Sequence, residues 1–316
     1  MRKPIHYLAI SFVVLIILVN LAGCASTRTQ GAVQADEYRR MQEKQKAEMS
    51  LEQVITQKLP EMTAEECEHL GDRYLSQGNM DMAFIYYQKA LYADPKQVRY
   101  RYKVGYLFLE RGMGKEAQAE FQEILKTDPA YAAAYEGLGR VSFHLGDLEG
   151  AESHFLKSLS LHAGSWQTHN YLGIVYDRQN RLDEAIEKFK KAISMKPNEP
   201  LLYNNLGMSL LRRGENSQAA RAFQEALQVG EPHPKIYNNL ALALCKLGKY
   251  TEALEVLKRS GDEASAYYHL GCIYLASKKY REAIDAFDRT IELSPSFHVK
   301  AYEKKQQAKV ALSVLQ

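Results

Sequence analysis

Residues 166–199 read WQTHNYLGIVYDRQNRLDEAIEKFKKAISMKPNE, and this stretch is one complete copy of a 34-residue unit that recurs along the chain. A shift of 34 residues brings one small residue of every copy into register: Gly71, Gly105, Gly139, Gly173, Gly207 and Ala241, with Gly271 after a four-residue deletion. The same shift aligns an alanine in seven copies, and a large ring or aliphatic side chain follows four residues after each. Recurrence at this period indicates a stacked-repeat architecture.

The unit itself is predicted to form two short helices joined by a turn. Apolar residues recur at helical spacing within 171–176 and again within 182–193. In six copies the turn holds a residue type that tolerates a left-handed backbone: Gly78, Gly112, Gly146, Asn180, Gly214 and Gly248. Lys278 takes this place in the last copy, where we expect a weaker helix cap. Gly173 and Ala185 should let helices approach closely, with Phe189 filling the space between neighbours.

This pattern resembles the tetratricopeptide repeat, which has characteristic residues at fixed offsets. In 166–199 they are Leu172-Gly173, Tyr176, Ala185, Phe189, Ala192 and Pro197. The resemblance covers seven copies, at 64–97, 98–131, 132–165, 166–199, 200–233, 234–263 and 264–297. It implies an all-α fold, a right-handed superhelical solenoid of about seven helix-turn-helix repeats. Residues 298–316 are predicted to form a C-terminal capping helix with a polar outer face.

The N-terminus has the composition of a secretory signal. Arg2 and Lys3 precede an apolar run over 7–19, and Leu21-Ala22-Gly23-Cys24 follows. The last four residues resemble the bacterial lipoprotein box, which implies a signal peptide over 1–23 and a Cys24 carrying diacylglyceryl and acyl chains such as palmitate. An uncleaved membrane anchor is the alternative, because 7–23 is at the short end of the roughly 17–25 residues that span a bilayer.

Residues 24–63 are interpreted as the lipidated cysteine, a polar tether and an N-terminal helix over 36–58, or else a disordered spacer. Ala25 and Ser26, in place of the aspartate that resembles an inner-membrane retention signal, favour an outer membrane with the repeats facing the periplasm.

Composition and motifs offer no support for catalysis. The formal net charge is +3 and no basic run with interleaved aromatics suits a nucleic acid. Cys67, Cys245 and Cys272 are not at metal-ligand spacing, and a Cys245–Cys272 disulfide is disfavoured because adjacent helix axes lie about 8–10 Å apart. We therefore predict no enzyme, no cofactor and no metal site. A hidden enzyme domain in 25–63 is disfavoured because so short a stretch cannot enclose a site.

The informative surface is the one that the resemblance places on the inner face of the first helices. The fifth position of the repeat is an asparagine in copies four to six: Asn170, Asn204 and Asn238. Asn205 and Asn239 follow two of them directly. The ninth position forms an apolar stripe of Tyr106, Ile174, Met208 and Leu242, and the thirteenth a basic stripe of Arg178, Arg212 and Lys246. Tyr102 holds the fifth position in the second copy, between Glu68 and Glu136 of its neighbours.

A column of amides suits the backbone of an extended peptide, and the basic stripe suits carboxylates. The alternatives are that the asparagines bond neighbouring repeats and that the basic residues stabilise helix ends. We expect a membrane-anchored periplasmic scaffold that binds a protein segment in this groove, in pilus or secretin assembly and without nucleic acid. Adaptors for envelope hydrolases or proteases, outer-membrane protein assembly, and a self-assembling structural solenoid are the alternatives.

Overall fold

The computed structural model describes residues 62–163, 165–231, 233–294 and 298–314. The predicted signal peptide, Cys24, the tether and the helix over 36–58 lie outside the described residues. Fifteen helices and no strands occur in the part of the chain that the structure describes. This confirms the prediction of an all-α repeat solenoid.

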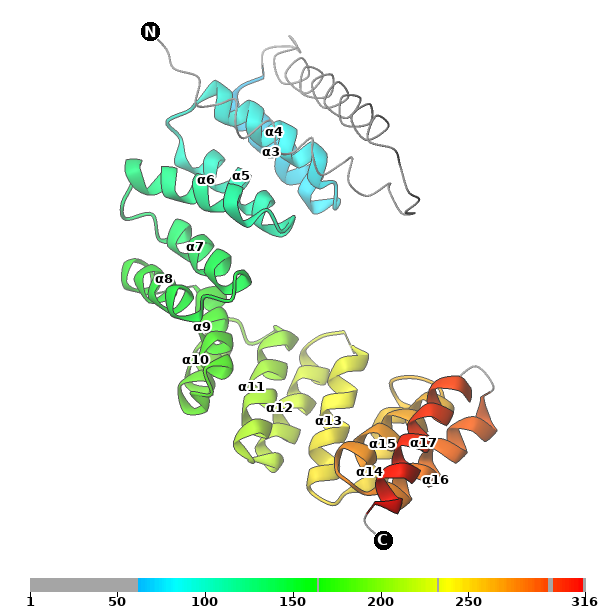
Figure 1. Cartoon of the computed structure of the whole chain (residues 1–316). Coiled ribbons are helices and arrows are strands. Elements are labelled where there is room, and N and C mark those ends of the chain that lie inside the picture. Colours follow the sequence, from blue (N-terminus) through cyan, green and yellow to red (C-terminus); the bar gives the residue numbers. More distant parts are fainter. Residues whose placement is uncertain (1–61, 164, 232, 295–297, 315–316) are drawn as a thin grey trace, which may run out of the picture. The chain divides into compact units, whose positions relative to one another are not determined.

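The chain divides into two compact units, residues 1–146 and 147–316. The described part of the first unit contains five helices: α3 (Ala64–Ser76), α4 (Met80–Ala93), α5 (Val98–Glu110), α6 (Gly114–Thr127) and α7 (Ala132–His144). Consecutive helices in this unit pack side by side, and α5 also contacts α7 (Figure 1).

The second unit contains ten described helices, of which the first five are α8 (Leu148–Leu161), α9 (Trp166–Arg178), α10 (Leu182–Met195), α11 (Pro200–Arg213) and α12 (Asn216–Val229). The other five are α13 (Pro234–Lys246), α14 (Tyr250–Lys258), α15 (Glu263–Ala276), α16 (Tyr280–Leu293) and α17 (His298–Ser313). Each helix contacts the next along the chain. The copy over 234–263 is four residues shorter than the others, and the difference falls in its second helix, α14, which is only 9 residues long.

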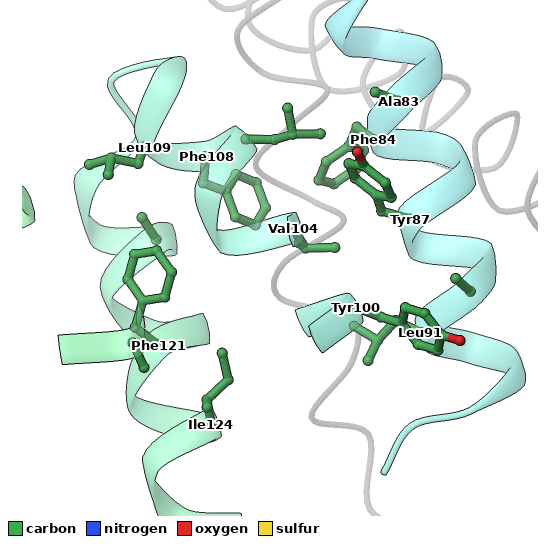
Figure 2. Packing of buried hydrophobic residues seen from close by; sticks show 14 of the residues in the cluster. Ala83, Phe84, Tyr87, Leu91, Tyr100, Val104, Phe108, Leu109, Phe121 and Ile124 are labelled. Carbon is green, nitrogen blue, oxygen red and sulfur yellow. The ribbon is translucent and has the colours of Figure 1, made fainter. Parts of the chain in front are cut away.

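Aromatic side chains fill the space between helices of the first unit. Figure 2 shows Phe84 and Tyr87 of α4 facing Val104 and Phe108 of α5, and all four are buried. The rings of Phe84 and Phe108 meet edge to face with centroids 5.3 Å apart. An edge-to-face pair of this kind contributes about 0.5–1.5 kcal/mol beyond its buried area, so this contact ties the first repeat to the second.

In five of the repeats a glycine of the first helix lies against the large ring of the second helix: Gly71, Gly105, Gly173, Gly207 and Gly271. A Cβ atom at Gly173 would come within 2.7 Å of Phe189, and one at Gly207 within 2.5 Å of Phe223. Phe189 and Phe223 are fully buried. The close approach predicted from the sequence is therefore present, and a larger residue has no room at either glycine.

The turn between paired helices uses a left-handed residue in the last full repeat too, although glycine is missing there. Lys278 has φ +59° and Asn180 has φ +63°. Lys278 also donates its backbone N–H to the carbonyl of Leu275 at 3.1 Å. A residue with a Cβ atom is disfavoured in this conformation by about 1–2 kcal/mol, so the weaker cap at Lys278 stays a prediction.

The final helix, α17, packs on α16 and α15 through two small residues. Ala301 and Ala308 are fully buried against Ala283 and Phe287. The exposed residues of α17 are both polar and apolar. Lys300, Glu303, Gln307 and Lys309 supply the polar surface predicted from the sequence, and Val299, Tyr302, Val310 and Val314 are exposed beside them.

Candidate protein-interaction surface

The first helices of the second unit form one continuous face. α9 contacts α11, α11 contacts α13, and α13 contacts α15, so side chains at the same position of successive repeats follow one another along this face. The asparagines, the apolar stripe and the basic stripe predicted from the sequence in copies four to six all lie on α9, α11 and α13.

The asparagines bond each other in pairs across the repeats. Asn205 donates from Nδ2 to Oδ1 of Asn170 at 2.9 Å, and Asn239 donates to Oδ1 of Asn204 at 2.8 Å. Asn170 and Asn204 are only 5% and 6% exposed. Asn205 and Asn239 are half-buried and keep contact with solvent. The asparagine at the fifth position of one repeat therefore accepts a hydrogen bond from the asparagine at the sixth position of the next repeat. Bonding between neighbouring repeats was the alternative interpretation of these asparagines.

The third member of the column, Asn238, ends this series. Its Oδ1 is buried and accepts no hydrogen bond from a described residue. The sixth position of the next copy, where an asparagine would donate to it, holds His269. Burial lowers the pKa of His269, which keeps its imidazole neutral at physiological pH.

The apolar stripe lies beside the asparagine pairs at intermediate depth. Ile174, Met208 and Leu242 are each half-buried, whereas the leucines that point into the core, such as Leu172 and Leu210, are almost fully buried. A half-buried apolar row on three neighbouring helices can take up further apolar surface, since each side chain still presents part of its area to water.

The basic stripe is partly neutralised within the protein. Arg212 forms an ion pair with the carboxylate of Asp177 and donates to the Asp177 carbonyl at 2.6 Å. It also donates to Oδ1 of Asn180 at 3.3 Å, while Ser209 donates to Asp177 at 2.6 Å. Arg178 and Lys246 are exposed. The Asp177–Arg212 ion pair was not predicted from the sequence. Its two residues are 35 positions apart, as are the two residues of each asparagine pair.

The first unit presents a different surface at the same positions. Tyr102 and Tyr106 are half-buried, and the Tyr102 ring lies 5.9 Å from those of Phe121 and Tyr131. Burial, together with the nearby Glu136 carboxylate, raises the pKa of Tyr102. Arg140 lies 5.4 Å from the centre of the Tyr106 ring. These rings are largely engaged inside the unit.

Charged groups on α3 and α5 also bond each other. Lys103 lies 2.8 Å from Glu68 and 2.6 Å from Asp72, which also accepts a hydrogen bond from the Tyr87 hydroxyl at 2.6 Å. Burial acts to raise the pKa of Asp72, but the bonds from Lys103 and Tyr87 outweigh it and hold that pKa below its ordinary value. The mixed charges of this unit therefore join adjacent repeats.

The cysteines and the possible metal ligands are the other candidate groups in the described part of the chain. Cys67, Cys245 and Cys272 are free thiols, and the pKa of each is raised by burial. Among the described residues, no three His, Cys, Asp or Glu side chains lie close enough to hold a metal ion. No described helix is both long enough and apolar enough to span a membrane.

Solved structures of other repeat proteins share this fold. PilF of Pseudomonas aeruginosa is 20% identical, with a TM-score of 0.55 over 62% of this chain and 90% of that one. PilW, described as a widely conserved type IV pilus biogenesis factor, is 17% identical, with a TM-score of 0.57 over 63% and 96%. The Cut9–Hcn1 tetramer matches at 19% identity and a TM-score of 0.56, over 83% of this chain and 51% of that one. No curated protein sequence matches the chain.

Two family models match the sequence. The tetratricopeptide-repeat model covers 264–297, which confirms the repeat type and its role as a scaffold for protein–protein interaction. The second model covers 25–266, most of the chain. The chain belongs to the family described as the cilia and flagella-associated protein 70 C-terminal domain.

Proposed function

We propose that the face formed by α9, α11 and α13 binds an extended segment of a partner protein. The observation that carries this proposal is the adjacency, on one continuous face, of half-buried apolar side chains and half-buried amides. Ile174, Met208 and Leu242 supply apolar contact, and Asn205 and Asn239 supply hydrogen bonds. An extended chain offers both apolar side chains and unpaired backbone groups, so it matches this surface better than a small molecule does.

The two asparagines of each pair have different roles: one is buried and accepts a hydrogen bond, and the other is half-buried and can contact a partner. Asn205 uses one N–H to bond Asn170, and an asparagine side chain has two donors and an acceptor oxygen. The second N–H and the oxygen of Asn205 are therefore available to a peptide backbone, and Asn239 is arranged in the same way. Asn170 and Asn204 act as positioning residues that fix the rotamers of the two contacting amides.

The basic residues would then contribute unequally to recognition. Lys246 is exposed and can attract a partner carboxylate, whereas Asp177 already compensates the charge of Arg212. A partner with acidic residues at one end of its bound segment fits this distribution.

The proposed setting is the bacterial cell envelope. Lipidation at Cys24 after removal of 1–23 would hold the repeats at an outer membrane, facing the periplasm, because several acyl chains anchor a protein stably. A pilus or secretin component is the partner class that we favour, since lipid-anchored repeat proteins of this size resemble pilus assembly lipoproteins. Envelope adaptors and outer-membrane protein assembly remain the alternatives. The signal-like N-terminus favours an envelope partner over a ciliary one.

Two comparisons test the proposal separately. Cys24→Ser should move the protein out of the membrane fraction while its circular dichroism spectrum stays helical; retention in membranes would contradict lipid anchoring. For the groove, Asn205→Ala with Asn239→Ala should reduce partner recovery from detergent-solubilised envelopes by at least about tenfold, the equivalent of 1.4 kcal/mol. Gln224→Ala with Glu225→Ala, two exposed residues on α12, is the matched control and should change nothing. Equal recovery in all three proteins would remove this face from the proposal.

A further inference from the structure

The outer face of α17 carries an exposed apolar row. Val299 is 66% exposed, Tyr302 49%, Val310 64% and Val314 79%. Val299 and Tyr302 lie near the start of the helix and Val310 and Val314 near its end, on the side away from the buried Ala301 and Ala308. Glu303, Gln306 and Gln307 lie between the two pairs. A shallow hollow of about 630 Å³ runs along this side, lined by Tyr302, Glu303, Gln306, Gln307, Val310 and Ala311. Single exposed apolar residues are ordinary, but four on one side of a single helix leave apolar area that a partner can cover.

The backbone does not return to cover this row within the described residues. The first helices of the repeats are 13 or 14 residues long, and a left-handed residue follows each of α3, α5, α7, α9, α11, α13 and α15 to reverse the chain. α17 runs for 16 residues and is still helical at Ser313. It takes the place of a first helix against α16, yet no described second helix packs on its other side.

The charges beside the row are mostly positive. Lys300 and Lys309 are exposed and form no ion pair with a described residue. Lys305 is already paired with Asp288, and Lys304 donates to Gln307 at 3.2 Å. Glu303 is the only acidic residue of α17. A partner surface that places carboxylates on both sides of an apolar stripe therefore complements this face.

We propose that the outer face of α17 docks an amphipathic helix of a partner protein, with an apolar stripe flanked by acidic residues. This surface lies on a different helix from the face formed by α9, α11 and α13. A helix is the expected shape because the two apolar pairs lie at the two ends of one face of α17, so a partner helix lying along α17 can contact both pairs.

Two other occupants fit the charges less well. A second copy of the chain would bring the same excess of lysines to the interface, and like charges oppose such pairing. The chain's own segment 36–58 contains five acidic and five basic residues, so it has no net charge to attract it to Lys300 and Lys309. Both remain distinguishable outcomes of the test.

The test uses the purified full chain and a pair of designed helical peptides. Both peptides carry leucines at every third or fourth position; one carries glutamates beside them and the other lysines. Fluorescence anisotropy at low salt should show the glutamate peptide binding at least about tenfold more tightly than the lysine peptide. Val310→Glu should abolish this binding, and Lys300→Glu with Lys309→Glu should remove the preference. Tyr92→Ala, at a residue 73% exposed on α4, is the matched control and should have no effect.

Each contrary result overturns the proposal. Equal affinity for the two peptides, or no binding of either, means that the face does not select an acidic helix. A doubled mass in light scattering that Val310→Glu returns to the single-chain value assigns the face to a second copy. Tighter binding of a synthetic 36–58 peptide than of the glutamate peptide assigns it to the chain's own N-terminal segment. None of these outcomes depends on whether Asn205 and Asn239 bind a partner.

Discussion

Asn205 donates its side-chain amide to Oδ1 of Asn170 at 2.9 Å, although the two residues are 35 positions apart. The same bond recurs one repeat further along, from Asn239 to Asn204 at 2.8 Å. Each pair joins a buried asparagine on one first helix to a half-buried asparagine on the next. The repeat interface and the proposed binding surface therefore share their polar groups, and a change to one should be felt by the other.

The Asn204–Asn239 bond should contribute measurably to stability. Asn239→Ala leaves the buried oxygen of Asn204 unpaired, so we expect the free energy of unfolding to fall by about 1–3 kcal/mol. Asn204→Ala removes the buried group itself, and the double variant should lose less than the sum of the two single losses. Urea unfolding of the four proteins gives the coupling energy. Strictly additive losses would show that the bond does not form in solution.

The contact between Gly207 and Phe223 should reject even one added methyl group. A Cβ atom there would lie 2.5 Å from the ring, and overpacking of this kind costs about 1–3 kcal/mol. Gly207→Ala should therefore lower the stability, although alanine favours a free helix by about 0.5–1 kcal/mol. Gly261→Ala, whose Cβ would lie 3.8 Å from Ser265, is the control and should be neutral. A more stable Gly207→Ala protein would contradict the packing described here.

The left-handed turn at Lys278 should be improvable. Its φ of +59° is unfavourable for a side-chain-bearing residue, whereas the matching turn in the preceding copy has Gly248 at φ +78°. Lys278→Gly should stabilise the chain by about 1 kcal/mol, and Gly248→Lys should destabilise it by a similar amount. Thermal unfolding of both variants measures the effect. Changes of the same sign in the two proteins would rule out this explanation.

The buried thiol of Cys245 should resist alkylation. Burial raises its pKa to about 11 from an ordinary value of 9.0, so little thiolate is present in the folded protein at pH 8. Iodoacetamide should label Cys245 slowly in the native chain and rapidly in urea, as peptide mass spectrometry can follow. Equal rates would show that the thiol is accessible.

The same pKa shift predicts a loss of stability at high pH. The folded thiol holds its proton up to a higher pH than the unfolded one, so its contribution is fully present below pH 9 and is lost as the pH rises from 9 toward 11. Cys245→Ala should make this alkaline decline less steep in urea titrations at pH 8, 9.5 and 10.5. An unchanged slope would contradict the shift.

Most of the fold could be predicted from the sequence because each repeat encodes its own helix pair. A left-handed turn residue recurs in all seven copies, and the glycine equivalent to Gly173 recurs in all but one, where Ala241 replaces it. Each weak local signal is therefore repeated along the chain. The outer face of α17 could not be predicted in the same way. Val299 and Val310 alternate with lysines along the sequence, and only the position of α16 decides which side of that helix faces solvent.

The candidate surface was predictable in outline. Spacing by 34 residues identifies Asn170, Asn204 and Asn238 as equivalent, but the hydrogen bonds join residues 35 apart, so the fifth position of one repeat meets the sixth of the next. Arg212 and Asp177, which compensates its charge, are also 35 residues apart. Which side chains of a stripe stay open to a partner depends on this shift between neighbouring helices.

Photo-crosslinking in living cells from two positions shows directly whether the face of α9, α11 and α13 binds a partner protein. A photoreactive amino acid at Met208, on the proposed groove, is compared with one at Gln224, an exposed residue on the neighbouring α12. If this face binds a partner, Met208 should capture one segment of that protein, identified by peptide mass spectrometry, and Gln224 should not. Asn205→Ala with Asn239→Ala should abolish this crosslink. The same products from both positions, or crosslinks from Met208 only to residues 36–58 of its own chain, would contradict partner binding at this face.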